Sequence, residues 1–278
     1  MAGNFNHQST ADDVLEGINL QDKRVLVTGG ASGIGAETVR AMAAKGAEVI
    51  IAARNQQQAE EVQAAVVAAT GNQNISIVSL DLASLVKVDA AAREFLQRFD
   101  RLDVLINNAG ISGPHLLEVS DFSTQRAFEQ LMMQTVAELC SRLIPGMRER
   151  GYGRVINVAS VAGRFPSSDS GNYGPAKAYV IALSEELCVA TRGSGVHVTA
   201  LCPGFTHTEF HEVAGMIEEK NSSPSWIWYD AATVVREGLT GCDKGRPVVV
   251  SGRLYRWLDP LLRSTLFRGV LLRIAGRG

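Results

Sequence analysis

Short runs of apolar residues alternate along the chain with longer stretches in which apolar residues recur every three or four positions. The short runs have the length of β-strands. They are rich in Val, Ile and Leu without strict alternation, which is typical of strands covered by helices on both faces. They occupy Arg24–Thr28, Glu48–Ala52, Ile75–Leu80, Asp103–Ile106, Arg154–Ala159, Val196–Cys202 and Pro247–Val250. The longer stretches have helical periodicity and cover Gly35–Lys45, Gln56–Ala69, Leu85–Phe99, Arg126–Arg150 and Tyr173–Thr191.

This repetition of strand and helix predicts an α/β fold with a doubly wound, Rossmann-type parallel sheet and helices on both faces. Linker-like Pro/Gly/Ser tracts and internal repeats are absent from the sequence, so we expect one main domain. We assign it to residues 21–252. Residues 1–20 are polar and form an N-terminal arm in this interpretation, and residues 253–278 form a separate C-terminal segment.

The C-terminal segment is both basic and apolar. It holds six arginines against one acidic residue. Asp259-Pro260 has the pattern of an N-cap followed by proline at the first helical position, which predicts a helix starting there. Such a helix could pack on the body of the protein, cover the substrate or lie on a membrane surface. We favour packing on the body.

Composition excludes several classes of protein. Among 278 residues there are 27 basic and 29 acidic side chains, and this balance argues against a dedicated nucleic-acid binder. With 46% hydrophobic and 20% charged residues, the chain is not disordered throughout. It contains no apolar run of about 18 residues that would span a membrane. The polar start, Met1–Asp13, lacks the apolar core of a signal peptide, which predicts a cytoplasmic protein.

Cysteines and histidines do not indicate a metal site. Cys140, Cys188, Cys202 and Cys242 are widely spaced within apolar segments, so we expect buried free thiols. His207 and the histidine four residues later, His211, lack a nearby third ligand. We therefore predict no metal.

The first predicted strand runs directly into a glycine-rich turn, Gly29-Gly-Ala-Ser-Gly33-Ile-Gly35, and a helix follows. Glycine lets the backbone turn sharply and approach a pyrophosphate, whose charge is met by the free N–H groups of the helix N-terminus. The spacing T-G-x-x-x-G-x-G differs from the familiar GxGxxG pattern. Strand, turn and helix in succession nevertheless indicate a dinucleotide site.

The end of the second predicted strand bears on the choice of dinucleotide. An acidic residue near this point usually binds the ribose hydroxyls of NAD, whereas an arginine accommodates the extra phosphate of NADP. Here Ala53 occupies the acidic position and Arg54 follows it, which favours NADP(H) over NAD(H). After the third strand, Asp81 with Leu82 could contact adenine, and capping of the next helix by Asp81 is at least as good an interpretation.

Tyr173 and Lys177 are four residues apart at the start of a predicted helix, so they share one face. A tyrosine with a pKa near 10 is a poor acid–base group at neutral pH. A neighbouring ammonium and an oxidised nicotinamide would stabilise the phenolate and lower that pKa. Ser160 ends a strand thirteen residues before Tyr173 and could bind a substrate oxygen.

Taken together, these motifs resemble the short-chain dehydrogenase/reductase (SDR) family. The resemblance rests on Thr28-Gly29…Gly33-Ile34-Gly35, Asn107-Asn108-Ala109-Gly110, Ser160, Tyr173…Lys177 and Pro203-Gly204…Thr208, and it covers roughly residues 20–252. It implies a single-domain fold with a seven-stranded sheet and an NAD(P)-dependent enzyme acting on CH–OH groups. In family terms Tyr173 is the general acid/base, Lys177 binds the nicotinamide ribose and Ser160 polarises the carbonyl.

The same resemblance implies which residues hold the cofactor. The phosphate loop matches Gly29, Ser32, Gly33, Ile34 and Gly35. Arg54 matches the position that marks NADP users, and Asp81 with Leu82 matches the adenine pocket. The remaining contacts match Asn108, Gly110, Pro203, Gly204 and Thr208, the last of which orients the carboxamide.

One position departs from the family pattern. Family members carry an asparagine about thirteen residues before a Leu/Ile-Pro pair, where it holds a water that links the lysine to solvent. Counting back from Ile144-Pro145 gives Met132, or Gln134 if a small gap is allowed. Proton delivery is therefore in doubt, whereas hydride transfer is not.

The segment after Gly204 suggests the kind of substrate. In the family it covers the substrate, and here it runs from Phe205 to about Tyr229 with Phe210, Met216, Trp226 and Trp228. These side chains favour a hydrophobic ketone, aldehyde or alcohol, although they could equally pack against the body or a neighbouring subunit. The leading hypothesis is an NADP(H)-dependent carbonyl reductase. The alternatives are an NAD-dependent dehydrogenase, a low-turnover dinucleotide-binding protein, and epimerisation or imine reduction on the same scaffold.

Family members also commonly form dimers or tetramers. By resemblance, the contacts would involve the helices around Arg126–Arg150 and Tyr173–Thr191. We therefore expect a homodimer or homotetramer.

Overall fold

A computed structural model describes residues 19–82, 84–114, 116–117, 122–165, 171–208 and 224–264, together with 266, 269 and 273. Within these residues one parallel sheet has seven strands, in the order β3-β2-β1-β4-β5-β6-β9. The strands are β1 (Arg24–Thr28), β2 (Glu48–Ala53), β3 (Ile75–Ser79), β4 (Val104–Asn107), β5 (Gly153–Val158), β6 (Val196–Cys202) and β9 (Val248–Val250). Each predicted strand is present, and no end differs from its predicted position by more than one residue.

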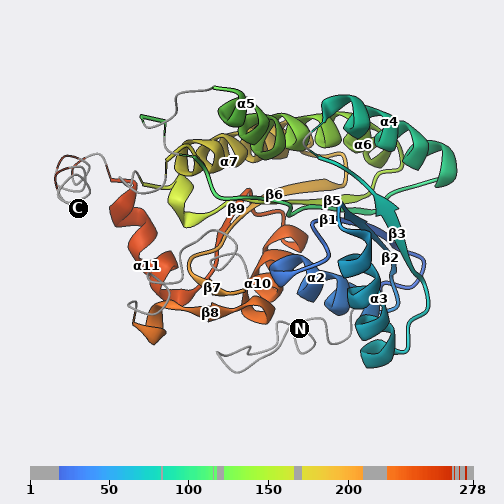
Figure 1. Ribbon diagram of the computed structural model, residues 1–278. Helices are drawn as coiled ribbons and strands as arrows, with labels where there is room; N and C mark the ends of the chain where they lie inside the picture. Colours follow the sequence, from blue (N-terminus) through green and yellow to red (C-terminus); the bar gives the residue numbers. More distant parts are fainter. Residues whose placement is uncertain are drawn as a thin grey trace.

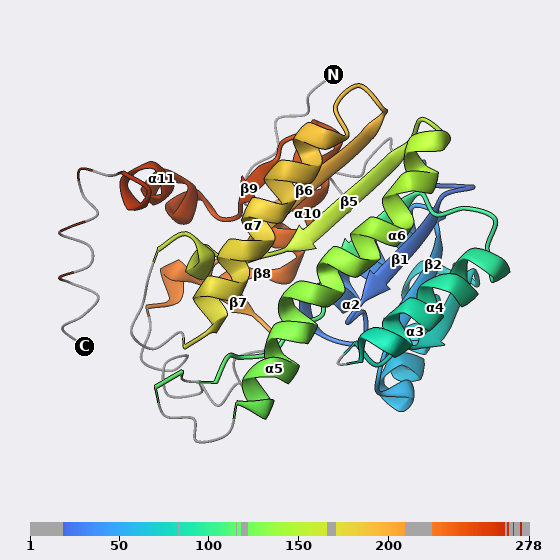
Figure 2. The ribbon, with the colours of Figure 1, turned by 90° about the horizontal axis from the view of Figure 1, so that it is seen from above.

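Helices cover both faces of this sheet (Figures 1 and 2). One face carries α2 (Gly33–Ala44), α3 (Gln56–Thr70) and α10 (Ala231–Asp243). The other carries α4 (Leu85–Arg98), α5 (Ser123–Glu129), α6 (Thr135–Glu149) and α7 (Tyr173–Ala190). Each face has its own apolar core, and the central strands contribute to both. The structure thus confirms the Rossmann-type fold, and burial on both faces explains why the strands are apolar throughout.

The stretch predicted as one helix over Arg126–Arg150 is divided in the structure. A π-helical segment, η1 (Gln130–Gln134), lies between α5 and α6. π-Helical turns occur frequently at functional sites, because they shift the side chains that follow relative to those that precede. Here the π segment contains Met132 and Gln134, the two residues predicted to stand at the position of the family asparagine.

Helix α11 (Arg253–Leu262) begins seven residues before the predicted start. The prediction that Asp259-Pro260 opens the helix is wrong. The N-cap is Gly252, and Pro260 lies inside the helix, where it removes one backbone hydrogen bond. The Asp259 carboxylate binds Arg164, 95 residues away in the sequence, instead of capping. Local sequence rules could not anticipate that partner.

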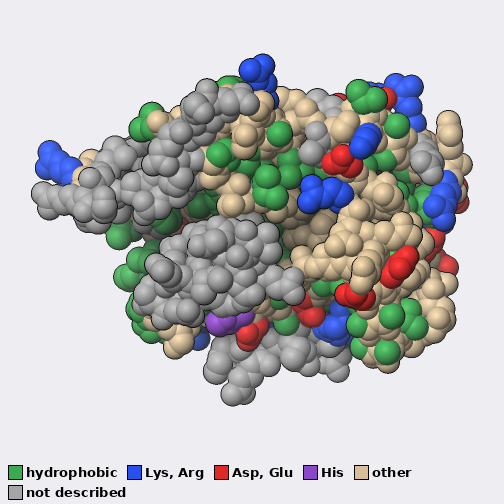
Figure 3. All heavy atoms as spheres, in the orientation of Figure 1, with side chains coloured by type: hydrophobic (Ala, Val, Ile, Leu, Met, Phe, Trp, Pro, Cys, Tyr) green, Lys and Arg blue, Asp and Glu red, His purple; other side chains and the backbone are tan. Residues whose placement is uncertain are grey.

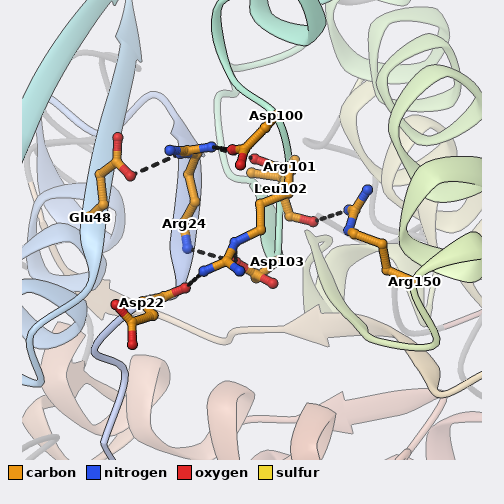
Figure 4. A network of polar contacts seen from close by, with 8 residues as sticks. All are labelled: Asp22, Arg24, Glu48, Asp100, Arg101, Leu102, Asp103 and Arg150. Atoms are coloured by element: carbon orange, nitrogen blue, oxygen red, sulfur yellow. Dashed lines mark hydrogen bonds and ion pairs between the residues drawn. The ribbon is translucent and has the colours of Figure 1, made fainter.

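Charged side chains join the amino ends of the strands, at the edge opposite the glycine turn. The Arg24 guanidinium at the start of β1 forms ion pairs with Glu48 (2.9 Å) and with Asp100 (Figure 4). The backbone N–H of Arg24 donates to the Asp103 carboxylate over 2.9 Å. These contacts hold the amino ends of β1, β2 and β4 in register. The carboxyl ends of these strands take no part in them.

The face of the molecule seen in Figure 3 has no dominant charge. Basic and acidic side chains are interspersed over the face seen in Figure 3. Among the described residues, no helix is long and apolar enough to cross a bilayer. All four cysteines are free; Cys140, Cys202 and Cys242 are buried and Cys188 is half-buried.

Candidate functional site

The order of the strands reverses between β1 and β4, and open sheets of this type bind ligands at the carboxyl ends of the strands at such a point. Thr28 and Asn107 end the two strands and are paired in register. The Asn108 side-chain amide donates to the carbonyl oxygen of Gly29 over 3.0 Å, and the Asn108 backbone N–H donates to the Thr28 hydroxyl over 3.0 Å. Asn108 therefore holds the glycine turn against β4.

The turn leaves no room for side chains at its key positions. A Cβ on Gly35 would lie 2.2 Å from the carbonyl oxygen of Gly29. Gly29 and Gly33 have φ angles of 62° and 51°, which favour glycine. A Cβ on Gly33 would contact the side chain of Thr208 at 3.2 Å, so Thr208 faces the turn. Ser32 is the exposed N-cap of α2 and makes no side-chain capping bond, while Ile34 is half-buried. This bare helix start fits a diphosphate.

The residues predicted for the adenosine half lie at the same edge of the sheet. Arg54 is exposed directly after β2, and Leu82 is buried after β3. Asp81 pairs with Lys87 over 3.0 Å, whereas the N-cap of α4 is Ser84. The alternative that Asp81 caps this helix is therefore wrong.

Ser160, Tyr173 and Lys177 lie together beyond the end of β5. Tyr173 is the first residue of α7, and its hydroxyl is hydrogen-bonded to that of Ser160. Ser160 also accepts a hydrogen bond from the N–H of Ala162 over 3.1 Å, which orients its side chain. The buried Lys177 ammonium donates to the carbonyl oxygen of Val158 over 2.7 Å and lies 5.5 Å from the centre of the Tyr173 ring.

Burial dominates the acid–base properties of this cluster. It raises the pKa of Tyr173 to about 12, and the hydrogen bond with Ser160 opposes the rise. Burial also lowers the pKa of Lys177 to about 8. The expected lowering of the tyrosine pKa is therefore not seen in the protein alone, because desolvation of the phenolate outweighs the other effects.

Met132 and Gln134 are the two candidates for the position of the family asparagine, and the structure places them differently. Met132 is fully buried, and its sulfur accepts a hydrogen bond from the backbone N–H of Ile111 over 3.4 Å. Its methyl carbon would lie 3.5 Å from a Cβ on Gly110. Gln134, the other candidate, is exposed. Of the two candidates, Met132 is therefore the one whose side chain is buried next to Gly110 and Ile111.

Part of the expected substrate segment lies outside the described residues, namely Phe210, His211 and Met216. In the described part, the Trp228 ring lies 5.0 Å from that of Phe205 and 5.3 Å from that of His207, centre to centre. The described residues contain no cluster of ligands suited to a metal ion. Sequence reasoning missed Tyr255 of α11, which contacts Gly204 and Phe205. The only signal was an aromatic residue at the start of the C-terminal segment.

Comparison with known proteins agrees with this geometry. The family model for short chain dehydrogenases matches residues 23–216.

The chain belongs to the short-chain dehydrogenase family.

This short-chain dehydrogenase is accordingly a dinucleotide-binding oxidoreductase of CH–OH and carbonyl groups. It is 34% identical over 200 residues to a 3-oxoacyl-(acyl-carrier-protein) reductase of Synechocystis sp., covering 72% of this chain and 78% of that protein. It is 30% identical over 191 residues to the D-beta-hydroxybutyrate dehydrogenase of Cupriavidus necator, covering 68% and 72%. A short-chain dehydrogenase from Sphingobium yanoikuyae, solved in complex with NADPH, superposes with a TM-score of 0.74 at 26% identity, covering 92% and 94%.

Proposed function

We propose that this short-chain dehydrogenase uses NADP(H) to interconvert a hydrophobic ketone or aldehyde and its alcohol. One observation carries the proposal. Ser160, Tyr173 and Lys177 meet at the carboxyl edge of the sheet that also presents the glycine turn. Bound nicotinamide would supply the hydride.

Each member of the cluster has a distinct role in this proposal. Ser160 donates a hydrogen bond to the substrate oxygen and orients it. Tyr173 gives its hydroxyl proton to that oxygen during reduction and removes it during oxidation. Lys177 binds the nicotinamide ribose, and its positive charge favours the phenolate. The neutral phenol that burial favours is the form required for reduction.

We assign the other cofactor contacts from their shared position at the carboxyl edge of the sheet. Gly29, Ser32, Gly33, Ile34 and Gly35 would hold the diphosphate. Arg54 would bind the 2′-phosphate of NADP, because it is exposed beyond β2 with no carboxylate at Ala53. Asp81 and Leu82 would line the adenine pocket. The nicotinamide half would contact Asn108, Gly110, Pro203, Gly204 and Thr208.

The proposal also covers the class of substrate, the domain organisation, the oligomeric state and the cellular location. The ring contacts of Phe205 and Trp228 favour an apolar substrate. The catalytic unit spans residues 21–252, flanked by the arm 1–20 and the segment 253–278, in a cytoplasmic homodimer or homotetramer. The curated relatives include a reductase of acyl-carrier-protein substrates and a hydroxybutyrate dehydrogenase, so both directions of reaction occur among similar proteins.

Met132 favours a second candidate, a dinucleotide-binding protein with little turnover. A panel of ketones and aldehydes, assayed with NADPH and with NADH by loss of absorbance at about 340 nm, decides between the two. Turnover of apolar carbonyl compounds with NADPH supports the reductase. Tight NADPH binding without turnover of any panel member supports the second candidate.

A further inference from the structure

One hydroxyl from the C-terminal helix joins two distant points of the chain. The Tyr255 oxygen accepts a hydrogen bond from the backbone N–H of Phe205 over 3.2 Å. The same hydroxyl donates to the carbonyl oxygen of Ile227 over 2.9 Å. Phe205 and Ile227 are 22 residues apart, and the Phe205 ring contacts that of Trp228, the residue after Ile227. Tyr255 thus ties together the described residues around this aromatic contact.

The backbone joins the same two parts of the chain. The N–H of Tyr229 donates to the carbonyl oxygen of Phe205 over 3.0 Å, and the short strands β7 (Thr206–His207) and β8 (Tyr229–Asp230) pair beside it. Figure 1 shows β7 and β8 on the side of the molecule where α11 lies. The hydrogen bonds of the Tyr255 side chain therefore add to the backbone pairing of β7 with β8. They come from a separate element, α11.

The Tyr255 ring also rests on a predicted cofactor contact. A Cβ on Gly204 would lie 2.0 Å from the ring, so only glycine allows this approach. The carbonyl oxygen of the preceding residue, Pro203, accepts a hydrogen bond from the N–H of Val161 over 2.9 Å. A displacement of the ring would therefore shift Gly204 and Pro203. Through the hydrogen bond of Pro203 it would also shift Val161, the residue next to Ser160.

A second tie lies one turn further along α11. Asp259 follows Tyr255 by four residues, so the two side chains share a face of the helix. The Asp259 carboxylate binds the Arg164 guanidinium in bidentate fashion, with 2.6 Å between Nε and Oδ1. Both side chains are largely buried, and Arg164 is four residues after Ser160. Helix α11 is thereby fixed to both loops of the site.

We propose that Tyr255 is a positioning residue that sets the geometry of substrate binding through its bonds to Phe205 and Ile227. This role rests on the proposed function. These hydrogen bonds of the Tyr255 hydroxyl go to the backbone of Phe205 and Ile227, not to the cluster of Ser160, Tyr173 and Lys177. Loss of the hydroxyl therefore affects binding of the carbonyl substrate more than the chemical step.

The test replaces Tyr255 by phenylalanine, which keeps the ring on Gly204 and removes both hydrogen bonds. We expect KM for the best carbonyl substrate to rise roughly five- to tenfold, with kcat and the Kd of NADPH changed less than about twofold. The N–H of Phe205 should also exchange with solvent deuterium faster, because it loses its acceptor. Tyr152→Phe is the matched control, since Tyr152 precedes β5 at the opposite edge of the sheet.

The possible outcomes distinguish a failure of the positioning role of Tyr255 from a failure of the proposed function. An unchanged KM in an active Tyr255→Phe enzyme overturns the positioning role, whatever the exchange rate shows. A proportionate loss of kcat and of melting temperature, without a specific rise in KM, also overturns it and indicates a structural residue. Wild-type protein that reduces no carbonyl compound on the panel overturns the proposed function, and the positioning role with it.

Discussion

The sulfur of Met132 accepts a hydrogen bond from the backbone N–H of Ile111 over 3.4 Å. Counting along the sequence predicts that Met132 stands where the family has an asparagine. The residue before Ile111 is Gly110, which would carry a Cβ only 3.7 Å from the Lys177 ammonium. An apolar side chain thus lies near Lys177, which we propose to bind the nicotinamide ribose. Under that proposal, the identity of residue 132 bears on how protons reach the site.

We predict that Met132→Asn accelerates turnover that is limited by proton delivery. The smaller, polar side chain leaves room for a water molecule and offers it hydrogen bonds. We expect kcat to rise about threefold and its solvent deuterium isotope effect to shrink. Met132→Leu, which conserves volume, is the control and should retain the wild-type isotope effect. A lower kcat with an unchanged isotope effect in Met132→Asn would contradict the prediction.

Tyr173→Phe should abolish catalysis and spare cofactor binding. The substitution removes the proton donor and conserves the ring, so we expect kcat to fall by about 10²- to 10⁴-fold. The Kd of NADPH, measured by fluorescence titration, should stay within about twofold of wild type. Tyr179→Phe alters an exposed tyrosine on the same helix and serves as the control. Retained turnover in Tyr173→Phe would remove this tyrosine from the mechanism.

Arg54→Ala should weaken NADPH binding selectively. The variant loses charge-assisted hydrogen bonds worth about 1.5–3 kcal/mol, which corresponds to roughly a 10- to 100-fold rise in Kd. NADH lacks the 2′-phosphate, and its Kd should not change. Arg98→Ala provides a control at an exposed arginine at the end of α4. If wild type binds NADH more tightly and Arg54→Ala leaves both affinities unchanged, Arg54 has no role in phosphate binding.

Gly35→Ala should destroy the dinucleotide site, because its Cβ would lie 2.2 Å from the carbonyl oxygen of Gly29. The turn must open to relieve this contact, so isothermal titration should detect no NADPH binding. Gly146→Ala is a matched control in α6, where the new Cβ would meet only the Arg150 side chain. The free energy of unfolding of that variant should equal that of wild type or exceed it by up to about 1 kcal/mol. Normal binding by Gly35→Ala would rule out a tight turn here.

Buried thiols should destabilise the protein at alkaline pH. Burial raises the pKa of Cys140 and of Cys202 from 9.0 to about 12 in the folded state. Above pH 9 the unfolded chain releases these protons first, so unfolding becomes more favourable as pH rises toward 12. Cys140→Ala should therefore flatten the fall in unfolding free energy between pH 9 and 10.5, measured with urea. Cys188→Ala, at a half-buried position, is the control. Equal slopes in wild type and Cys140→Ala would refute the linkage.

Local patterns determine much of this protein. The strands are predicted to within a residue, because burial on both faces of a parallel sheet requires continuous apolar runs. The glycine turn is evident because only glycine fits its backbone, and Tyr173 with Lys177 because one helical turn separates them. These features depend on neighbouring residues and so leave a short-range signal in the sequence.

Other features were decided only when distant segments packed together. Asp259 looked like a helix cap, yet it binds Arg164, which is 95 residues away. Tyr255 joins Phe205 to Ile227, and Met132, which lies in the π-helical segment, contacts Ile111. The raised pKa of Tyr173 likewise arises from burial that no stretch of sequence encodes by itself. Contacts and desolvation of this kind depend on which surfaces meet in three dimensions, and local propensity does not specify that.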